Sequence, residues 1–423
     1  MQSTTMNSVF LECYLAHNLG DDLFLETLLR RYPDVHFTCV VDGSYDWLLE
    51  RYHNISLVRP PRKKSALGGV PVPGDNTPRI IDDRAGKSYR NRRPGPDHRG
   101  LPNMVMGRLS LLSSISYTNE LAALKCQSVR NCGILVVIGG SLYIQPIWKH
   151  SLFTTVFSLR DVLQRKRLYS SADKTFVLGT NFGPYRNSWY KKSYSDIFNK
   201  YVTDICFRDQ YSFQLFKSDE HIRVAPDILF GTEFPRVERK KKVLFSVVDL
   251  GNTMKFRDLS SCSADYDSWI VNAANCYANL GYDIQLCGFS TVEHDDVAVA
   301  RISHLLAQES IQHDCLTYDN DTSRILSAIA ESEVIVGTRF HASILGLAAG
   351  CKVLPIIYSD KTSHSLDDIG FASDIRLDLR NFKSDDISIC RKVLARERVD
   401  IGEVKTQSQR HFIGLDCVLG VGR

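Results

Sequence analysis

The chain has 423 residues, of which 43% are hydrophobic and 24% are charged, as in an ordinary globular protein. This length exceeds one ordinary core, so we expect two domains of roughly 200 residues each. The formal net charge of +4 indicates no particular partner, and we expect no nucleic-acid binding.

Export and membrane signals are missing from the sequence. No stretch approaches the ~20 apolar residues of a membrane span, and Glu12, His17 and Asp21 interrupt the apolar run that a signal peptide would need. The twelve cysteines are scattered singly, with no CxxC pair. We therefore expect free thiols in a cytoplasmic protein, and no zinc site.

The first 60 residues read as strand, turn, helix and strand. Residues 8–15 favour a strand, and residues 18–22 a tight turn in which Gly20 takes a positive φ. Leucines at 23, 25, 28 and 29 predict an amphipathic helix that Asp21 or Asp22 caps. Residues 36–41 predict the next strand, so the chain begins as a βαβ unit with a mostly parallel sheet.

Residues 60–103 break this pattern. They hold ten Lys and Arg against four Asp and Glu, together with eight of the fourteen prolines. A segment without periodicity is either an insertion loop or a mobile segment. We favour a solvated surface loop, and a basic flap over an acidic substrate is the alternative.

Strands that end in polar or glycine-rich loops fill the rest of the first half. The strand at 133–138 leads to Gly139-Gly140-Ser141, the strand at 175–178 to residues 179–184, and the strand at 204–207 to Arg208-Asp209. Another strand ends near Asp227, and helices are predicted at 107–126 and 152–166. In open α/β sheets the carboxyl ends of the strands bind ligands.

The charged segment 233–242 marks a domain boundary, because the alternation of strands and helices starts again after it. We place the domains at 1–236 and 237–385, followed by a helical segment, 386–423, that can pack back on the first domain. The second half has strands at 243–248, 283–287, 333–336 and 352–357 and helices at 267–280, 295–308, 323–330 and 342–349. Two Rossmann-like halves that face a cleft resemble the GT-B architecture.

Arg339 and His341 lie between a buried strand and a helix of small residues. A helix start favours anions, Arg offers a planar fork to a carboxylate or phosphate, and His suits proton transfer. Lys361 follows the next strand, and Arg208 is the matching cation in the first domain. Each has a plainer interpretation, such as an ion pair with a neighbouring acid or a solvated lysine.

Other candidates carry weaker signals. Asn18 and Asp21 can bind substrate hydroxyls, although a capped turn explains them nearly as well. Gly139-Gly140-Ser141 is a weak phosphate-loop signal, and Asp227 can be an ordinary cap.

Taken together, these pieces resemble the polysaccharide pyruvyl transferase family. The matching residues appear in family order over nearly the full length, apart from residues 60–103. They are 18–21, 138–141, 179–184 with Asn181, 207–209 with Ser212, 226–227, 337–342 with Phe340, and Tyr358 with Lys361.

The resemblance implies transfer of the pyruvyl group of phosphoenolpyruvate to two hydroxyls of a sugar, giving a cyclic ketal and phosphate. His341, Arg339 and Lys361 would be catalytic, and Arg208, Phe340, Asn18, Asp21, Ser141 and Asn181 would bind substrate. The first domain would hold the acceptor and the second the donor, with no cofactor or metal. The acceptor would be lipid-linked, nucleotide-linked or polymeric, and a membrane-bound acceptor implies peripheral contact with the membrane.

The sequence departs from the family in having Ser141 where a third glycine is common, and in residues 60–103. Two other functions stay open. One is a GT-B nucleotide-sugar glycosyltransferase, in which Asp319 or Asp321 would hold a ribose. The other is a catalytically silent member that binds carbohydrate or a partner.

Overall fold

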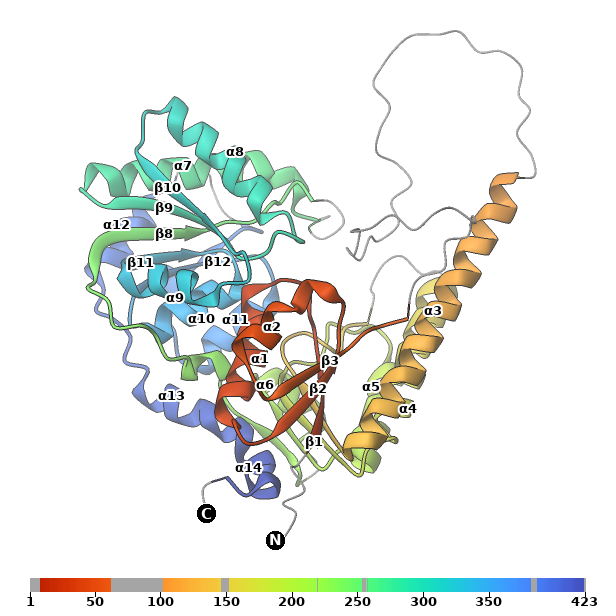
Figure 1. The fold of residues 1–423 in the computed structure, drawn as a ribbon. Helices are drawn as coiled ribbons and strands as arrows, with labels where there is room; N and C mark the ends of the chain where they lie inside the picture. The colour runs from red at the N-terminus through yellow and green to blue at the C-terminus, as the bar shows by residue number, and fades with distance from the viewer. Residues whose placement is uncertain are drawn as a thin grey trace, which may run out of the picture.

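The computed structural model describes residues 8–61, 102–145, 152–218, 220–252, 256, 258–381 and 386–421. These residues form two α/β halves, which Figure 1 shows one above the other. The predicted segment 60–103 therefore lies almost entirely outside the described residues. Among these residues, no helix is long and apolar enough to cross a membrane.

The first half is built on a seven-stranded parallel sheet of order β3-β2-β1-β4-β5-β6-β7. Its strands are β1 (Ser8–Cys13), β2 (His36–Val40), β3 (Ile55–Val58), β4 (Ile134–Ile138), β5 (Lys174–Thr180), β6 (Asp204–Phe207) and β7 (Ile222–Val224). Its helices are α1 (Leu19–Arg31), α2 (Trp47–Arg51), α3 (Pro102–Cys132), α4 (Leu152–Tyr169), α5 (Ser188–Tyr201) and α6 (Gln210–Phe216), with short 3₁₀ turns η1 (Gly43–Tyr45) and η2 (Ile228–Gly231).

The second half repeats this topology with a six-stranded parallel sheet of order β10-β9-β8-β11-β12-β13. Its strands are β8 (Lys240–Ser246), β9 (Asp283–Gly288), β10 (His313–Thr317), β11 (Ser332–Gly337), β12 (Lys352–Ile357) and β13 (Leu377–Asp378). Its helices are α7 (Ser263–Asn279), α8 (Asp295–Gln308), α9 (Thr322–Glu331), α10 (Phe340–Ala348) and α11 (Asp360–Asp368), with 3₁₀ turns η3 (Ser260–Cys262) and η4 (Ser373–Ile375). The predicted pair of Rossmann-like halves is confirmed.

Both sheets reverse their strand order beside their first strand. In the first sheet β1 lies between β2 and β4, and in the second β8 lies between β9 and β11. Helices that leave neighbouring strands at this point go to opposite faces of the sheet, which opens a crevice at the carboxyl ends of the strands. The central strands are buried on both faces, since Leu135, Val136, Val137 and Ile138 of β4 are all 0% exposed, and their continuous apolar sequence is typical of such strands.

The start of α1 differs from the prediction. The helix begins at Leu19, and Asn18 caps it by accepting a hydrogen bond from the Gly20 N–H at 3.1 Å. Asp21 and Asp22 lie inside the first turn. Gly20 is helical, and the positive φ of this region belongs to His17, at 47°.

Three helices of the first half were not predicted: α2, α5 and α6. The buried side of α5 consists of aromatic residues and Ile197, and Tyr190, Tyr194 and Phe198 pack against Tyr143 and Phe182. Aromatic residues are only moderate helix formers, so the sequence carried little helical signal here. Packing against the sheet decides the outcome.

The C-terminal segment reaches both halves. Helix α12 (Ser388–Ala395) packs on β12 and α7 of the second half. The chain then crosses to the first half through α13 (Gly402–Ser408), the turn η5 (Gln409–Phe412) and α14 (Ile413–Leu419). There Asp416 pairs with Arg31 at 2.6 Å and accepts a hydrogen bond from the Tyr32 hydroxyl at 2.7 Å. All twelve cysteines carry free thiols, as predicted.

The two halves contact each other through α1. The Leu19 N–H donates to the Phe289 carbonyl at 3.1 Å. Deeper in the contact, the buried carboxylate of Asp22 accepts hydrogen bonds from the Tyr45 hydroxyl of the first half at 3.0 Å and from the Tyr318 hydroxyl of the second at 2.7 Å. Figure 1 shows α9, α10 and α11 between the two sheets.

Asp22 gives this contact a pH dependence that can be measured. Burial raises the pKa of Asp22 from 3.8 to about 7, so between these pH values the folded chain keeps a proton that the unfolded chain has released. Below pH 3.8, the pKa of Asp22 in the unfolded chain, its contribution to the free energy of unfolding is complete. Between pH 3.8 and the folded-state pKa of about 7, this contribution falls by at most about 1.4 kcal/mol per pH unit. We expect the stability difference between wild type and Asp22→Asn to follow this course in urea denaturation at a series of pH values. A difference that does not change with pH would contradict this role.

Candidate functional site

Polar side chains from both halves converge where the carboxyl ends of the two sheets face each other. The first half contributes residues that follow β1, β4, β5 and β6, and the second half contributes residues that follow β11 and β12. The loops after β1, β4 and β11 flank the two points at which the strand order reverses. This is the position at which open α/β sheets bind ligands.

A chain of hydrogen bonds connects the two halves at this point. Arg208 donates to Asp227 at 3.1 Å and to the Asn181 side-chain oxygen at 2.6 Å. Asn181 also accepts from the Ser141 hydroxyl at 2.9 Å, and the Lys361 ammonium lies 3.5 Å from Ser141. The structure thus brings Arg208, Asn181, Ser141 and Lys361 together, although the first three come from three different loops and Lys361 from the first turn of α11.

Phe340 lies beside both cations. The Arg208 guanidinium carbon is 4.7 Å from the centre of the Phe340 ring, and the Lys361 nitrogen is 5.1 Å from it. An aromatic face attracts cations within about 6 Å. Phe340 is only 3% exposed, so its part in the site is to hold the two cations in place.

His341 is the residue on which these charges act. Its pKa lies well below the usual 6.5 because burial disfavours the charged ring, and because Arg208, Lys361 and Arg339 repel a proton. The imidazole is therefore neutral at neutral pH. Its Nε2 is shielded from solvent and, like Nε of Arg208, finds no hydrogen-bond partner among the described residues.

Gly20 allows His341 to reach this position. A Cβ atom on Gly20 would lie 1.7 Å from Nδ1 of His341, so the ring rests directly on the backbone of α1. The prediction that Gly20 takes a positive φ is wrong, and a glycine is required here by the close approach of His341. Asp21 lies in the same turn, and a Cβ atom on Gly140 would be 3.6 Å from its carboxylate and 3.7 Å from the Arg208 guanidinium.

Arg339 differs from the expectation that its fork faces a substrate anion. Its guanidinium is 5% exposed and pairs with both oxygens of Asp295 and with Glu293. Asp295 also accepts the backbone N–H groups of Phe289 and Ser290, each at 3.0 Å. Arg339 therefore acts on His341 through its charge, while its donors connect β11 to α8.

Several acids have roles that the sequence did not reveal. Asp227 was considered only as a cap; it does cap η2 and, in addition, compensates the buried Arg208. Asp209 directly follows Arg208 in the sequence but caps α6, where it accepts a hydrogen bond from the Ser212 N–H at 2.7 Å. Asp319 pairs with Arg324, and Asp321 caps α9 through the Ser323 N–H at 3.1 Å. Within the described ranges, no group of three or more His, Cys, Asp or Glu is arranged to hold a metal.

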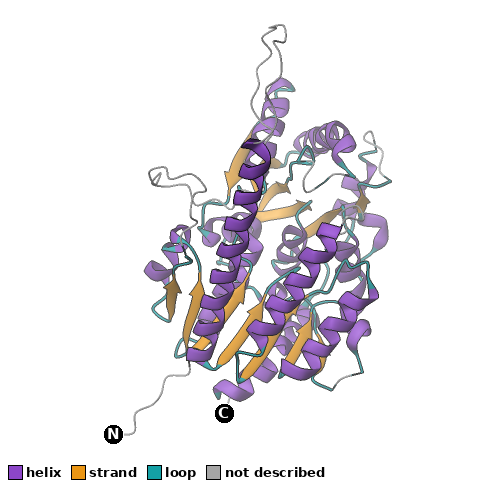
Figure 2. Cartoon of the chain, turned by 90° about the vertical axis from the view of Figure 1, so that its right-hand side faces the viewer, coloured by secondary structure: helices purple, strands orange, loops and turns teal. Residues whose placement is uncertain are grey.

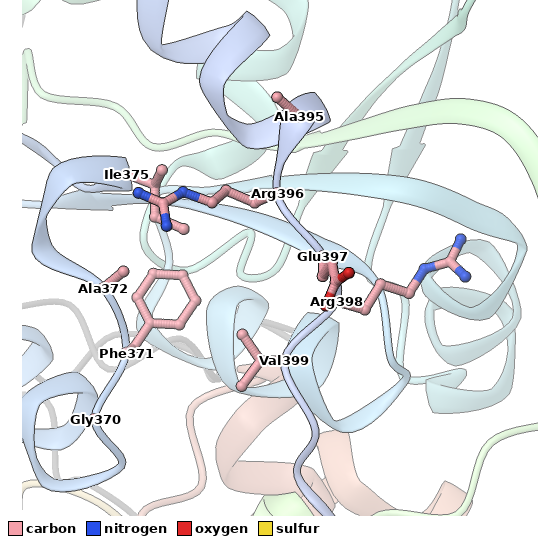
Figure 3. A pocket seen from close by; sticks show the side chains of 9 residues that line it. All are labelled: Gly370, Phe371, Ala372, Ile375, Ala395, Arg396, Glu397, Arg398 and Val399. Carbon is pink, nitrogen blue, oxygen red and sulfur yellow. The ribbon is translucent and has the colours of Figure 1, made fainter.

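The pocket in Figure 3 lies elsewhere. It has a volume of about 440 Å³ and is lined by the residues after α11 and by the segment that follows α12. Arg396 and Phe371 extend along its walls in Figure 3. None of the predicted site residues lines it.

Two facing Rossmann-like halves with a cation cluster at their strand ends place the protein in the GT-B-like class of folds. A family model described as polysaccharide pyruvyl transferase matches residues 18–360, and the chain belongs to this family of transferases. The matched range contains eight of the nine predicted site residues, all but Lys361, which follows it directly. No curated protein matches the chain.

Solved structures of low sequence identity share the fold. Anabaena HepE in complex with UDP-glucose superposes with a TM-score of 0.51 at 10% identity, covering 98% of each chain. UDP-GlcNAc 2-epimerase from Methanocaldococcus jannaschii gives a TM-score of 0.51 at 9% identity, covering 98% of this chain and 99% of that one. At these identities the likeness concerns the fold alone.

The ion pair of Arg339 can be tested by removing Asp295. The change Asp295→Ala leaves a buried guanidinium short of acceptors and two backbone N–H groups unpaired, so we expect a loss of about 3–5 kcal/mol in the free energy of unfolding. The matched control is Asp296→Ala, since Asp296 is the next residue of α8 and is exposed. Its change should stay below about 1 kcal/mol, and equal losses in urea denaturation would contradict the role of Asp295.

Proposed function

We propose that the protein transfers the pyruvyl group of phosphoenolpyruvate to two hydroxyls of one sugar in a polysaccharide or its precursor, forming a cyclic ketal and releasing phosphate. The observation that carries the proposal is the convergence of Arg208, Lys361 and Arg339 on the neutral imidazole of His341. A donor with a carboxylate and a phosphate needs clustered cations. A ketal-forming reaction needs a group that moves protons beside them.

Donor binding would use the two cations that Phe340 holds. Lys361 would contact the carboxylate or the phosphate of the donor. Arg208 is 2% exposed and already donates to Asp227 and Asn181, so its unpaired and buried Nε would have to turn toward the donor to reach it. Arg339, whose fork is occupied, would stabilise the anion through its field. Cations placed before the reaction would also stabilise negative charge on the departing phosphate.

The protons balance in two steps. The first hydroxyl adds to C2 of phosphoenolpyruvate, and its proton is matched by the one that the methylene carbon gains to become a methyl group. The second hydroxyl then displaces phosphate at C2 and gives up its proton with the phosphate. A neutral His341 enters this sequence as a base that accepts a proton from an attacking hydroxyl, and the donor anion favours the resulting imidazolium.

The acceptor would lie against the first half, within reach of Asn18, Asp21, Ser141 and Asn181. Asn18, Asn181 and Ser141 already use their side-chain oxygens in the fold, so an acceptor hydroxyl would exchange with one of these hydrogen bonds. Because HepE carries UDP-glucose on the same fold, a nucleotide-linked acceptor is one option beside a lipid-linked or polymeric one. No cofactor is required by this scheme.

Phosphate release from phosphoenolpyruvate in the presence of a panel of sugar acceptors tests the proposal. We expect His341→Gln to lower kcat/KM by at least about 100-fold, the usual contribution of a proton-transferring side chain. The matched control is His304→Gln, because His304 is exposed on α8. The two variants should unfold at similar denaturant concentrations.

Each rival function predicts a different outcome of this assay. Turnover of a nucleotide sugar without use of phosphoenolpyruvate would identify a glycosyltransferase and contradict the proposal. Affinity for carbohydrate with no turnover of any donor would identify a silent family member. Equal activity of wild type and His341→Gln would remove His341 from the mechanism.

The pH profile tests the electrostatics of the site. If neutral His341 is the base, kcat/KM falls on the acid side as the free enzyme binds a proton, and the low pKa places this limb below pH 6.5. Replacing Lys361 with Gln removes one of the charges that lower the pKa, so the acid limb should move to higher pH. Ionisation of the donor is common to both proteins and cancels in the comparison. An unmoved limb would contradict the coupling of Lys361 to His341.

A further inference from the structure

The solvent face of α4 is apolar over two turns. Val156 is 61% exposed, Leu159 49% and Leu163 55%. Residues spaced by three and four positions share one side of a helix, so these side chains form a continuous stripe. Phe157, 54% exposed, widens it.

The neighbouring helices present polar residues instead. Helix α4 packs beside α3 and α5, and Figure 2 shows helices of this side running next to one another. The exposed positions of α5 include Lys192, Asp196, Asn199 and Lys200, and those of α3 include Asn119, Glu120, Gln127 and Arg130. Among the side chains that the structure describes on these three helices, which exclude residues 102–115 of α3, the exposed apolar stripe therefore belongs to α4.

Two positively charged residues lie on the same face of α4 as the apolar stripe. Lys166 and Arg167 are exposed and lie three and four positions after Leu163, which puts them on the stripe's side of the helix. Apolar and basic side chains on one helix face favour an anionic membrane surface, whereas protein interfaces are depleted in lysine.

The stripe begins near the candidate site. Helix α4 follows the loop that carries Ser141, so its N-terminal end lies at the carboxyl edge of the first sheet. Two further apolar residues are exposed in loops at this edge, Ile144 (43%) and Tyr14 (52%). Exposed apolar side chains thus occur both in loops at this edge and on the first part of α4.

We propose that the face of α4 formed by Val156, Phe157, Leu159, Leu163, Lys166 and Arg167 docks on an anionic lipid bilayer. The acceptor sugar would then be presented at the membrane surface on a lipid carrier. This second statement rests on the proposed function, and the docking itself does not.

Co-sedimentation with vesicles tests the docking without any substrate. Wild type should partition onto vesicles of phosphatidylcholine with phosphatidylglycerol, more weakly at high salt, and not onto phosphatidylcholine alone. Changing Val156, Leu159 and Leu163 to Gln should lower the partition coefficient by about tenfold or more. Changing Lys166 and Arg167 to Gln should lower it by about 25-fold, since each charge near the surface contributes about fivefold.

Matched controls separate the face from general surface effects. Val297→Gln with Ile413→Gln removes exposed apolar side chains on α8 and α14, and Lys192→Gln with Lys200→Gln removes charges from α5. Both pairs should bind vesicles as wild type does. Binding that survives the α4 changes, or absent binding of wild type, would overturn the proposal, as would a dimer that dissociates only in the α4 variants.

Activity on a soluble acceptor separates this inference from the proposed function. The α4 variants should keep wild-type phosphate release in solution and lose it only with a vesicle-borne acceptor. Vesicle binding without any phosphoenolpyruvate turnover would keep the docking and contradict the proposed function. Phosphoenolpyruvate turnover without vesicle binding would support the proposed function and contradict the docking.

Discussion

The structure depends on holding several cations close to one imidazole at the junction of two domains. Such charges repel one another and lose hydration on burial, so each needs compensation that leaves its field intact. Asp227 compensates Arg208, Asp295 and Glu293 compensate Arg339, and Phe340 offers its ring to Arg208 and Lys361. Burial lowers the pKa of His341, and the remaining positive charge of Arg208, Lys361 and Arg339 lowers it further. The cations that add to the effect of burial on His341 would also favour an incoming anion.

The arrangement also explains why two domains are needed. Arg208, Asn181 and Ser141 come from the first sheet and Lys361 and His341 from the second, so the site exists only when α10 and α11 lie against the first half. The approach of His341 to Gly20 and the hydrogen bonds to Asp22 fix this position. Since the same loops would hold the acceptor on one side and the donor on the other, contact between the domains aligns the two substrates.

Much of the site follows from the sequence because parallel strands end at a common edge. Arg208, Ser141, Asn181, His341 and Lys361 each follow a predicted strand, so their meeting could be expected. The ion pair of Arg339 could not be expected, because its partner Asp295 lies 44 residues away in the sequence. This partner is recognisable only once α8 and β11 are known to be adjacent. The role of Gly20 was hidden for a similar reason, since His341 follows it by 321 residues in the sequence. Aromatic packing likewise produced α5 where propensity gave little signal.

The central claim is that the cation cluster binds a phosphoenolpyruvate anion beside a neutral His341. Calorimetric titration with phosphoenolpyruvate near neutral pH, in buffers of different ionisation enthalpy, measures the affinity and the protons taken up on binding. Because His341 stays neutral in the complex, wild type and His341→Gln should both bind the anion and should take up the same number of protons. No binding by wild type, or a proton uptake that His341→Gln lacks, would contradict the account.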